Sequence, residues 1–578
     1  MDSKIFYGKP SSSTVVEHEE DGTSSESEFS DGDIYEPDQI SSSGDSSADD
    51  ATDLSDDETT TENDDLDTPA AQSDWKPVAA SARSFPFTRK EEINLQLITK
   101  QSPLPIDIFN LFVSDEIIEY IVAETNRFAA QQIANATITR RSTLNLWKDT
   151  NSVELRHFIG LLIYMGLVQK PEISLYWSKS AIYSDLFAPK VMSRQRFQML
   201  LRFIHFNDNQ SPLLHQDKLH KIRPLIDMMC EKYQEIYKPG PDLVIDESMV
   251  AFRGRAGIRQ YLPGKSHKYG LKLYKICTPE AYTWNFKIHS GKGNQIDGLN
   301  TTESLTVSMI QNILNTGSTI YSDNFYSSLV LAEYLMKKKT YMCGTIRKNR
   351  KYLSKEVIGA KLQKKEMKCQ ENNNGVKIYN WRDKRNVHMI STIPEHGDSL
   401  VQSGKLNRKG EDILKPECVL AYNSAKKGVD VSDQMTSYHT SLRRSLKWYR
   451  KAAFEIITGI TVVNAHVLYN KYFTDTRMQI RQFRDSLALS LTGIPENDIR
   501  PGRAAAVIQG KSVPHLLTEG DRASKKRKRC RGCYEKLSLS ENCKIARNKA
   551  RRVSTYCNQC EGQPHLCITC FGEKHENA

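Results

Sequence analysis

The sequence lacks the features of a secreted or membrane-spanning chain. Its first ten residues, MDSKIFYGKP, contain no basic stretch followed by an apolar run, so we expect no secretory signal. Its longest apolar stretch, Phe158 to Val168, is far shorter than the roughly 18 residues that a membrane span requires. We therefore interpret that stretch as a buried helix and expect no membrane among the partners of this chain.

Cysteine is scarce along most of the chain. Seven of the 12 cysteines fall within the last 49 residues. A secreted disulfide-bonded protein would distribute its cysteines through the framework, so this distribution favours an intracellular protein with a metal-binding tail. The clustered residues are Cys530, Cys533, Cys543, Cys557, Cys560, Cys567 and Cys570.

Basic residues are equally scarce in the first part of the chain. Residues 1–70 contain 22 Asp or Glu and only two lysines, so this segment carries −20. Because the formal net charge of all 578 residues is +10, the remainder carries +30. A basic body of this size indicates an anionic polymer as partner. The acidic head has too few apolar side chains to form a core, so we expect it to be disordered.

Hydrophobic periodicity divides the body into helical and mixed parts. Phe109, Phe112 and Ile117 belong to a run with helical spacing, which predicts a mostly helical segment from about residue 95 to a Pro-Gly breaker near 240. Beyond it, apolar residues alternate with polar ones. This pattern predicts three strands, a helix, a strand, a helix and a strand, which together form a mixed α/β unit. Helical spacing returns from 440 to about 490.

Three places in this α/β unit carry aspartates where catalysis could occur. Asp246 and Asp323 each end a short apolar strand, and Asp430 and Asp433 would share one side of a helix. A carboxylate beside a buried strand is costly unless it is paired or bound to a cation. Such a cluster suits Mg²⁺, and two such ions can promote in-line phosphodiester displacement. The alternative is that each aspartate is a turn or cap residue.

Several longer motifs occur in an ordered series. FRGRAGIRQYLPGKSHKYGLKLY, SDNFYSSLVLAEYL, MCGTIRKNR, AYNSAKKGVDVSDQM and RRSLKWYRKAAFEII follow one another along the chain. In this order and spacing the chain resembles the piggyBac family of DNA transposases, from about Asp107 to the C-terminus. The head resembles that family only in being acidic and disordered.

The resemblance implies an α/β fold with an RNase H-like catalytic core that is split by an insertion and flanked by a discontinuous helical domain. Combined with the boundaries that composition and periodicity indicate, it predicts a series of parts along the chain. These are a disordered acidic region at 1–94, a helical dimerisation and DNA-binding domain at 95–241 and 440–515, the catalytic domain at 242–349 and 416–439, an insertion domain at 350–415, a basic linker at 516–529 and a cysteine-rich zinc-binding domain at 530–578.

The resemblance also implies a chemistry. Asp246, Asp323 and Asp430 match the family's metal-binding triad, with two Mg²⁺ per active site, and Asp433 matches its additional essential carboxylate. Water nicks the transposon end, the freed 3′-hydroxyl forms a hairpin on the opposite strand, and the opened ends join a TTAA target. The implied partners are double-stranded DNA carrying the terminal repeats and a second copy of the chain. The alternative is a domesticated, non-catalytic DNA- or chromatin-binding protein.

Basic residues beside these motifs are candidate DNA contacts. Arginines and lysines can hold phosphates, and an exposed tryptophan can stack on an unpaired base. The alternative is a solvated helix face with the tryptophan in the core. The candidates are Arg253, Arg255, Arg259, Lys265 and Lys268 after the first aspartate, and Arg443, Arg444, Lys447 and Trp448 after the last.

The tail supplies eight soft ligands. Three Cys-x-x-Cys pairs and two histidines suffice for two tetrahedral zinc ions. The resemblance implies a cross-braced finger, with one site formed by Cys530, Cys533, His565 and Cys567 and the other by Cys557, Cys560, Cys570 and His575. Just before it, five consecutive basic residues indicate a nuclear localisation signal, a contact to the DNA backbone, or both, so we expect a nuclear protein; the alternative is a solvated linker. They are Lys525, Lys526, Arg527, Lys528 and Arg529.

Overall fold

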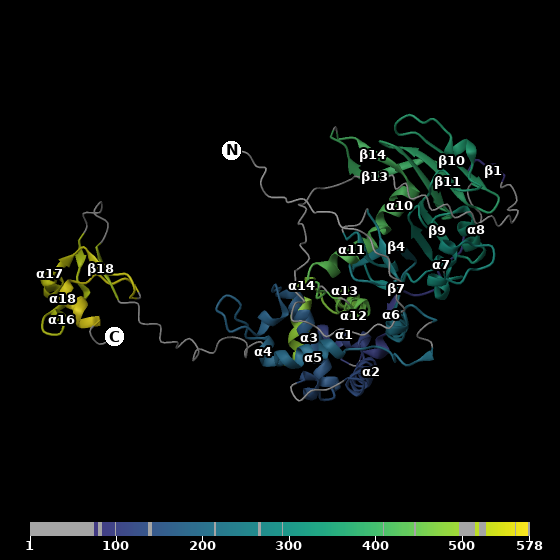
Figure 1. Ribbon diagram of the computed structural model, residues 1–578. Coiled ribbons are helices and arrows are strands. Elements are labelled where there is room, and N and C mark those ends of the chain that lie inside the picture. Colours follow the sequence, from purple (N-terminus) through teal and green to yellow (C-terminus); the bar gives the residue numbers. More distant parts are fainter. Residues whose placement is uncertain are drawn as a thin grey trace, which may run out of the picture. The chain divides into compact units, whose positions relative to one another are not determined.

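The computed structural model divides the chain into two compact units, residues 1–493 and 494–578 (Figure 1). The acidic head is predicted to be disordered, and its residues 1–73 lie outside the described part of the structure. The described residues are 74–78, 84–98, 100–136, 142–212, 216–263, 267–291, 293–408, 410–443, 445, 447–495, 515–519, 527–560 and 562–575.

A helical region of the first unit is built from two stretches of sequence, apart from the helices that accompany the sheet. α14 packs along α3, and α13 packs against α1, so the two stretches form one helical region. The first stretch contains α1 (Pro105–Phe112), α2 (Asp115–Ala134), η2 (Thr143–Leu146), α3 (Ser152–Leu167), η3 (Ile173–Trp177), α4 (Ala188–Val191), α5 (Arg194–Phe203), η5 (His220–Ile222) and α6 (Arg223–Ile236); the second contains α12 (Trp448–Phe454), the π-helical η7 (Glu455–Ile460), α13 (Thr461–Tyr472) and α14 (Ile480–Thr492).

The apolar stretch Phe158 to Val168 forms most of α3, as predicted. Asn151 caps this helix by accepting a hydrogen bond from the Glu154 amide at 3.0 Å. Among the described residues, one continuous helix, Trp448–Tyr472, is long and apolar enough to cross a membrane, and 83% of its most apolar window is buried inside the protein. That burial is typical of a core helix.

A ten-stranded mixed sheet forms the other half of the first unit. Its order is β1-β10-β11-β12-β9-β8-β4-β6-β5, and β7 also pairs with β6. β8 runs parallel to β4 and β9, whereas the other pairings are antiparallel. The strands are β1 (Trp75–Lys76), β4 (Asp242–Ala251), β5 (Arg259–Tyr261), β6 (Tyr269–Cys277), β7 (Thr283–Ile288), β8 (Thr319–Ser322), β9 (Tyr341–Thr345), β10 (Met367–Asn372), β11 (Lys377–Arg382) and β12 (Asn386–Ser391).

The predicted sequence of elements in the α/β part is confirmed except for the short β5, which the prediction of three strands before the first helix missed. After β7 come α7 (Thr301–Ile310) and η6 (Gln311–Ile313), then β8, α8 (Leu329–Lys337) and β9. β8 is buried along its whole length, which explains its continuous apolar run instead of alternation. β4, β8 and β9 point the same way, so their carboxyl ends lie at one edge of the sheet.

The predicted insertion at 350–415 is partly continuous with the main sheet. The predicted hairpin forms as β11 and β12, and β12 pairs with β9. Two further elements precede the next helices, namely α9 (Lys355–Ile358) and the separate hairpin of β13 (Leu400–Leu406) and β14 (Asp412–Pro416). α10 (Glu417–Ala425) and α11 (Lys427–Ser437) then return to the sheet, and α11 packs against β4 and β6 (Figure 1). A short pair, β2 (Glu92–Ile93) and β3 (Tyr237–Lys238), lies outside the sheet.

The second unit is small and built around cysteines. β15 (Leu517–Glu519) pairs with β18 (Thr555–Cys557), and β16 (Lys528–Arg529) pairs with β17 (Arg552–Val553). Two of these strands lie in the segment that composition predicts as a linker, because Leu517 packs against the cysteine cluster and Lys528 and Arg529 join a ribbon. The helices among its described residues are α16 (Arg531–Ser538), α17 (Cys543–Lys549) and α18 (Ile568–His575).

Candidate functional site

Asp246 and Asp323 lie where the parallel pairing of β4 and β8 ends. Asp323 follows β8, as predicted, whereas Asp246 lies in the middle of β4, which continues to Ala251 in its pairing with β6. The parallel register of β4 and β8 ends with the pair Ile245 and Ser322, and each aspartate is the following residue. Asp246 Oδ1 accepts a hydrogen bond from the Glu247 amide at 2.7 Å, and Asp323 Oδ1 accepts one from the Phe325 amide at 2.9 Å. The topology therefore brings together two aspartates that are 77 positions apart in the sequence.

A third carboxylate crowds this edge of the sheet. Burial raises the pKa of the Asp323 carboxyl, and the negative charge of Glu247 raises it further. The Glu247 carboxylate accepts a hydrogen bond from the Tyr326 hydroxyl at 3.1 Å. Sequence reasoning missed Glu247, although its place directly after Asp246 was the available signal. Carboxylates in such proximity favour protonation or a bound cation.

Asp430 approaches from the helix above the sheet. It lies in the first turn of α11, is exposed, and belongs to the helix that packs on β4 and β6. Gly428 permits this approach, because a Cβ there would lie 2.3 Å from the Thr278 carbonyl oxygen. Three aspartates from β4, β8 and α11 thus belong to one region of the first unit.

Asp433 has a different neighbour. Its Oδ1 lies 2.6 Å from the Nζ of Lys275 on β6. The Lys275 side chain is fully buried, whereas that of Asp433 is 35% exposed. The predicted fourth carboxylate is therefore paired with an ammonium group.

The aspartates form an open set of oxygen ligands. Among the described residues, the groups of ligand atoms that all lie within 4.8 Å of one another consist of cysteine and histidine, and no aspartate belongs to them. Oxygen donors at a partly buried sheet edge nevertheless fit a hard cation such as Mg²⁺, whose coordination includes water and substrate oxygens. Asp246, Asp323 and Asp430 are the residues that would hold it.

The first soft-ligand cluster consists of four cysteines, Cys530, Cys533, Cys567 and Cys570. The Cys533 sulfur lies 3.7 Å from those of Cys567 and Cys570. A tetrahedral zinc ion with Zn–S bonds of about 2.3 Å separates its sulfur ligands by about 3.8 Å. The spacing and the donor type therefore fit a structural zinc ion.

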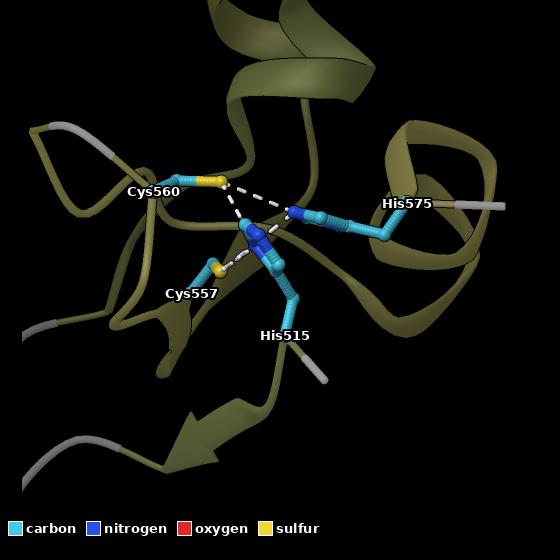
Figure 2. A group of neighbouring side chains, drawn as sticks. All are labelled: His515, Cys557, Cys560 and His575. Carbon is cyan, nitrogen blue, oxygen red and sulfur yellow. Dashed lines mark hydrogen bonds between the residues drawn. The ribbon is translucent and has the colours of Figure 1, made fainter. Parts of the chain in front are cut away.

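The second cluster combines Cys557 and Cys560 with His515 and His575 (Figure 2). The Cys560 sulfur lies 3.4 Å from His515 Nδ1 and 3.1 Å from His575 Nε2. His575 Nδ1 contacts the Phe571 carbonyl oxygen at 2.8 Å, so this bond can orient the ring toward the sulfurs. Two cysteines and two histidines again form a donor set for zinc.

This grouping corrects the pairing that the family resemblance implied. Each Cys-x-x-Cys pair contributes both sulfurs to one site, so Cys567 and Cys570 are not divided between sites. His565 belongs to neither cluster, because it forms a β-bridge with Tyr556, and His515 takes the place of a ligand. Sequence reasoning missed His515 because it lies 42 residues before Cys557, outside the cysteine-rich segment. Cys543 is exposed and belongs to neither group, as expected of a spare residue.

A basic hairpin follows the first aspartate. No acidic residue occurs between Glu247 and Glu280, whereas this interval contains seven lysines and arginines. Four predicted DNA contacts in it are exposed, and Lys265 lies outside the described residues. The exposed four are Arg253, Arg255, Arg259 and Lys268.

Two exposed tyrosines accompany these cations, and sequence reasoning missed them as well. Tyr261 and Tyr269 are cross-strand partners on β5 and β6, with ring centroids 4.7 Å apart and exposures of 47% and 44%. The Arg259 guanidinium lies 5.4 Å from the centre of the Tyr269 ring. Residues alternate between sheet faces, so Tyr269 shares the face of Lys275, six residues or about 20 Å along β6. Asp246 is the cross-strand partner of Lys275, so its side chain lies on the same face of the sheet as Lys275 and Tyr269.

Residues 104–466 match the family model described as Transposase IS4, and this match covers more than half of the chain. The chain belongs to that family. Within it, the chain is of the piggyBac type. It is 25% identical over 463 residues to the human "PiggyBac transposable element-derived protein 3", covering 76% of this chain and 74% of that protein. The human "PiggyBac transposable element-derived protein 2" is 24% identical over 499 residues, with coverages of 82% and 81%.

The fold agrees with a solved structure of the same type. The cryo-EM structure of the piggyBac transposase synaptic complex with hairpin DNA superposes with a TM-score of 0.61. The two are 23% identical, and the alignment covers 84% of this chain and all of the other. The mixed sheet with its helices is therefore the fold of a piggyBac transposase.

The basic residues after Asp430 in this family member are more buried than expected. The Arg443 guanidinium donates to the carbonyl oxygens of Lys170 at 2.9 Å and Met165 at 3.1 Å, and it also bonds the Tyr176 hydroxyl. It therefore joins helices instead of facing solvent. Trp448 begins α12 and packs edge-on against Tyr449, with ring centroids 6.2 Å apart. Lys447 is half-buried, and Arg444 lies outside the described residues.

Three residues of the basic run, Arg527, Lys528 and Arg529, belong to the described part of the second unit. Lys525 and Lys526 lie outside the described residues, whereas Lys528 and Arg529 form β16. Arg529 pairs with Arg552 on β17, and its Nε donates to the Arg547 carbonyl oxygen at 2.7 Å. These exposed arginines form a ribbon with a positive edge.

Proposed function

We propose that this chain is a metal-dependent DNA transposase of the cut-and-paste type. The observation that carries the proposal is the parallel register of β4 and β8, which sets Asp246 and Asp323 side by side below the helix that bears Asp430. Membership of the transposase family supports the same reading of these three residues. Function in this case rests on the site, because the fold by itself is compatible with other activities.

The proposed catalytic domain is RNase H-like. Five strands in the order β7-β6-β4-β8-β9 support this, with β4, β8 and β9 parallel and the other two antiparallel. In this proposal residues 242–349 and 416–439 form the domain, and the hairpins between them are the insertion. The helical region formed by residues 95–241 and by α12 to α14 would then dimerise and bind DNA, whereas the end of the predicted segment 440–515 supplies His515 to the second unit.

The residues act in the following way. Bound Mg²⁺ ions, two per site, would supply positive charge that activates the attacking oxygen and stabilises the leaving one. Asp246, Asp323 and Asp430 hold this centre at the sheet edge. The exposed cations Arg253 and Arg255, between β4 and β5, and Arg259 and Lys268 near the β5–β6 hairpin would hold phosphates of the DNA strand.

The proposed reaction proceeds by successive displacements at phosphorus. Water attacks a phosphate at the transposon end, and the bond from phosphorus to the 3′-oxygen breaks. The freed 3′-hydroxyl attacks the opposite strand and closes a hairpin. After water opens the hairpin, the 3′-ends attack phosphates at a TTAA target. The attacks by a 3′-hydroxyl exchange one phosphodiester bond for another, whereas the attacks by water leave a terminal phosphate and a free 3′-hydroxyl.

The remaining parts have supporting roles in this proposal. The two zinc clusters shape the second unit as a DNA-binding module, with the Arg529 and Arg552 ribbon available for phosphates. A homodimer would hold the two transposon ends. The basic run from Lys525 to Arg529 would direct the protein to the nucleus, where its substrate is.

Substitution of one aspartate tests the proposal. Asp246→Asn should lower cleavage of a duplex carrying the terminal repeats that flank this reading frame by roughly a thousandfold or more, because one metal-binding oxygen is lost. Binding of the same duplex, measured by gel shift, should persist. The matched control is Asp412→Asn, since Asp412 is an exposed aspartate of the separate hairpin that accepts a bond from Gln402 at 3.0 Å.

Two outcomes contradict the proposal in different ways. Cleavage that survives Asp246→Asn would show that the catalytic centre lies elsewhere. Intact protein that binds the duplex with Mg²⁺ but never cleaves it would favour the domesticated DNA-binding protein instead.

A further inference from the structure

A buried lysine lies beside the proposed catalytic aspartates. Lys275 is the cross-strand partner of Asp246 in the antiparallel pairing of β4 and β6, so both side chains leave the same face of the sheet. Its Nζ contacts Asp433 Oδ1 at 2.6 Å. The ion pair thus joins the strand beside Asp246 to the helix that carries Asp430.

The ion pair belongs to a closely packed contact between α11 and the sheet. Asp433 is three residues after Asp430, so both lie on one side of the helix. One residue before Asp433, the Ser432 hydroxyl lies 3.2 Å from the Thr283 hydroxyl on β7. One turn earlier, Gly428 lies against the Thr278 backbone. The ion pair is the charged member of this row of contacts.

The lysine remains charged despite its burial. Burial lowers the pKa of the Lys275 ammonium, but the charge of Asp433 outweighs this and leaves the pKa raised. A buried ion pair of this kind contributes little net stability relative to an apolar pair, yet removing one partner leaves an unpaired charge. Such a pair is suited to selecting one arrangement of two elements.

We propose that Lys275 is a positioning residue that acts through Asp433 to hold α11, and with it Asp430, in register with Asp246 and Asp323. This inference rests on the proposed function. It assigns Asp433 to the support of the metal centre instead of its coordination. It also adds a residue, Lys275, that neither the motif nor the family resemblance singles out.

Charge and position predict opposite effects when Lys275 is removed. If the ammonium only added positive charge near the carboxylates, Lys275→Met would strengthen cation binding. If it positions α11, the same change would misplace Asp430 and weaken cation binding. Loss of a residue that orients a ligand typically costs 10- to 100-fold in metal affinity.

The experiment compares full-length variants in two measurements. One is the Mg²⁺ concentration that gives half-maximal cleavage, and the other is the affinity for Mn²⁺ in a direct titration. Lys275→Met and Asp433→Asn should each raise both values by roughly 10- to 100-fold. The double variant should bind Mn²⁺ no more weakly than the single variant with the larger loss, because both changes remove the same interaction. Lys275→Arg keeps the charge and should recover part of the loss.

The double variant and a control keep the test decisive. The double variant leaves neither member of the Lys275–Asp433 pair unpaired, and the buried Glu455 loses its interaction with Lys275 in the single and the double variant alike. The comparison therefore separates positioning from a failure of Lys275→Met to fold. Lys287→Met is the matched control, because Lys287 lies one strand away on β7 and contacts the Ser308 hydroxyl at 2.7 Å. It should leave both measurements unchanged.

Each result judges a definite claim. Unchanged or tighter Mn²⁺ binding in Lys275→Met, or additive losses in the double variant, would overturn the positioning role. Wild-type protein that binds Mn²⁺ through Asp246 without cleaving DNA would contradict the proposed function. The Mn²⁺ titrations of the variants would then still test the role of Lys275. Wild-type and Asp246→Asn proteins that bind Mn²⁺ alike would overturn both.

Discussion

The described residues of the first unit pack around a wide apolar core, whereas those of the second unit pack around its own cysteines. In the first unit, Trp284, Tyr233 and Phe109 are fully buried between the sheet and the helices. The buried cluster of the second unit has six members, and four of them are Cys530, Cys557, Cys567 and Cys570. A unit this small buries too little apolar surface to be stable by packing alone, so we expect its fold to depend on metal bound at the two clusters.

The two kinds of metal centre differ in the same way. The ligand atoms of each soft cluster already lie within 4.8 Å of one another, and four protein ligands complete a closed structural site. Asp246, Asp323 and Asp430 come from two strands and a helix and belong to no such closed group among the described residues, which leaves room for water and substrate. A closed site stabilises a fold, whereas an open one leaves positions for a reaction.

Zinc removal should therefore have the largest effect and should act on one unit. A strong chelator should unfold residues 515–575, because apparent zinc binding energies in small domains are about 10–16 kcal/mol. The first unit should keep its helical circular dichroism and its protease resistance. Limited proteolysis with mass spectrometry locates the change, and cleavage spread evenly over both units would refute the distinction.

Single substitutions sharpen the same prediction. Metal analysis should find two zinc ions in the wild type and one in His515→Ala, while His565→Ala, its matched control, keeps two. In the same way Cys570→Ser should lose zinc and Cys543→Ser should not. A His565→Ala protein with one zinc ion would restore the pairing that the family resemblance implied.

Local pattern predicted most of the fold. The strands and helices between residues 242 and 349 were predictable because alternation and helical spacing are properties of neighbouring residues. The same holds for the hairpin at 376–393 and for the apolar helices. Asp246 and Asp323 were predictable as candidates because each follows a short apolar run in the sequence, although the strand that contains Asp246 continues beyond it.

The interactions that escaped prediction join residues far apart in sequence. Lys275 and Asp433 are separated by 158 positions, and no local pattern marks their contact. His515 is an isolated histidine in a segment without cysteines, so its role depends on the fold of β15 against β18. Arg443 resembled a phosphate contact by composition, but tertiary packing buries it against Lys170 and Met165.

Acid should reveal the packing of the first unit, with a smaller effect than zinc removal. Burial lowers the pKa of His205 to about 4, and its ring stacks on Phe128 with centroids 4.1 Å apart. In the unfolded chain the His205 ring takes up a proton near pH 6.5, whereas in the folded chain it does so only near pH 4. The free energy of unfolding is therefore highest above pH 6.5 and falls on acidification. The loss amounts to about 2 kcal/mol between neutral pH and about pH 5.

Denaturant titrations at neutral pH and at about pH 5 test whether His205 causes this loss of stability. His205→Gln lowers stability at neutral pH because the stacked ring is lost. It should also flatten the fall in unfolding free energy on acidification by most of that amount. An equally steep fall in the variant would place the acid-sensitive group elsewhere.

The two units should also differ in how they hold DNA, and this is the smallest effect. Tyr261 and Tyr269 present aromatic faces, and stacking on an unpaired base is worth about 1–3 kcal/mol. Tyr261→Leu should weaken binding of a short single-stranded oligonucleotide about tenfold, measured by fluorescence anisotropy, with the same salt dependence. Tyr261→Phe keeps the ring and should bind as the wild type does.

Arg552→Ala in the second unit provides the contrast. An arginine that contacts phosphate releases counterions, so its loss should reduce the slope of log affinity against log salt by about 0.7. Stacking releases few ions, so the tyrosine variant should change affinity and not slope. If Tyr261→Leu changed the slope, or if Tyr261→Phe bound as weakly as Tyr261→Leu, the tyrosine would act through its hydroxyl on phosphate. The β5–β6 hairpin and the zinc-dependent unit would then contact DNA in the same way, and the distinction between them would be confined to how each one folds.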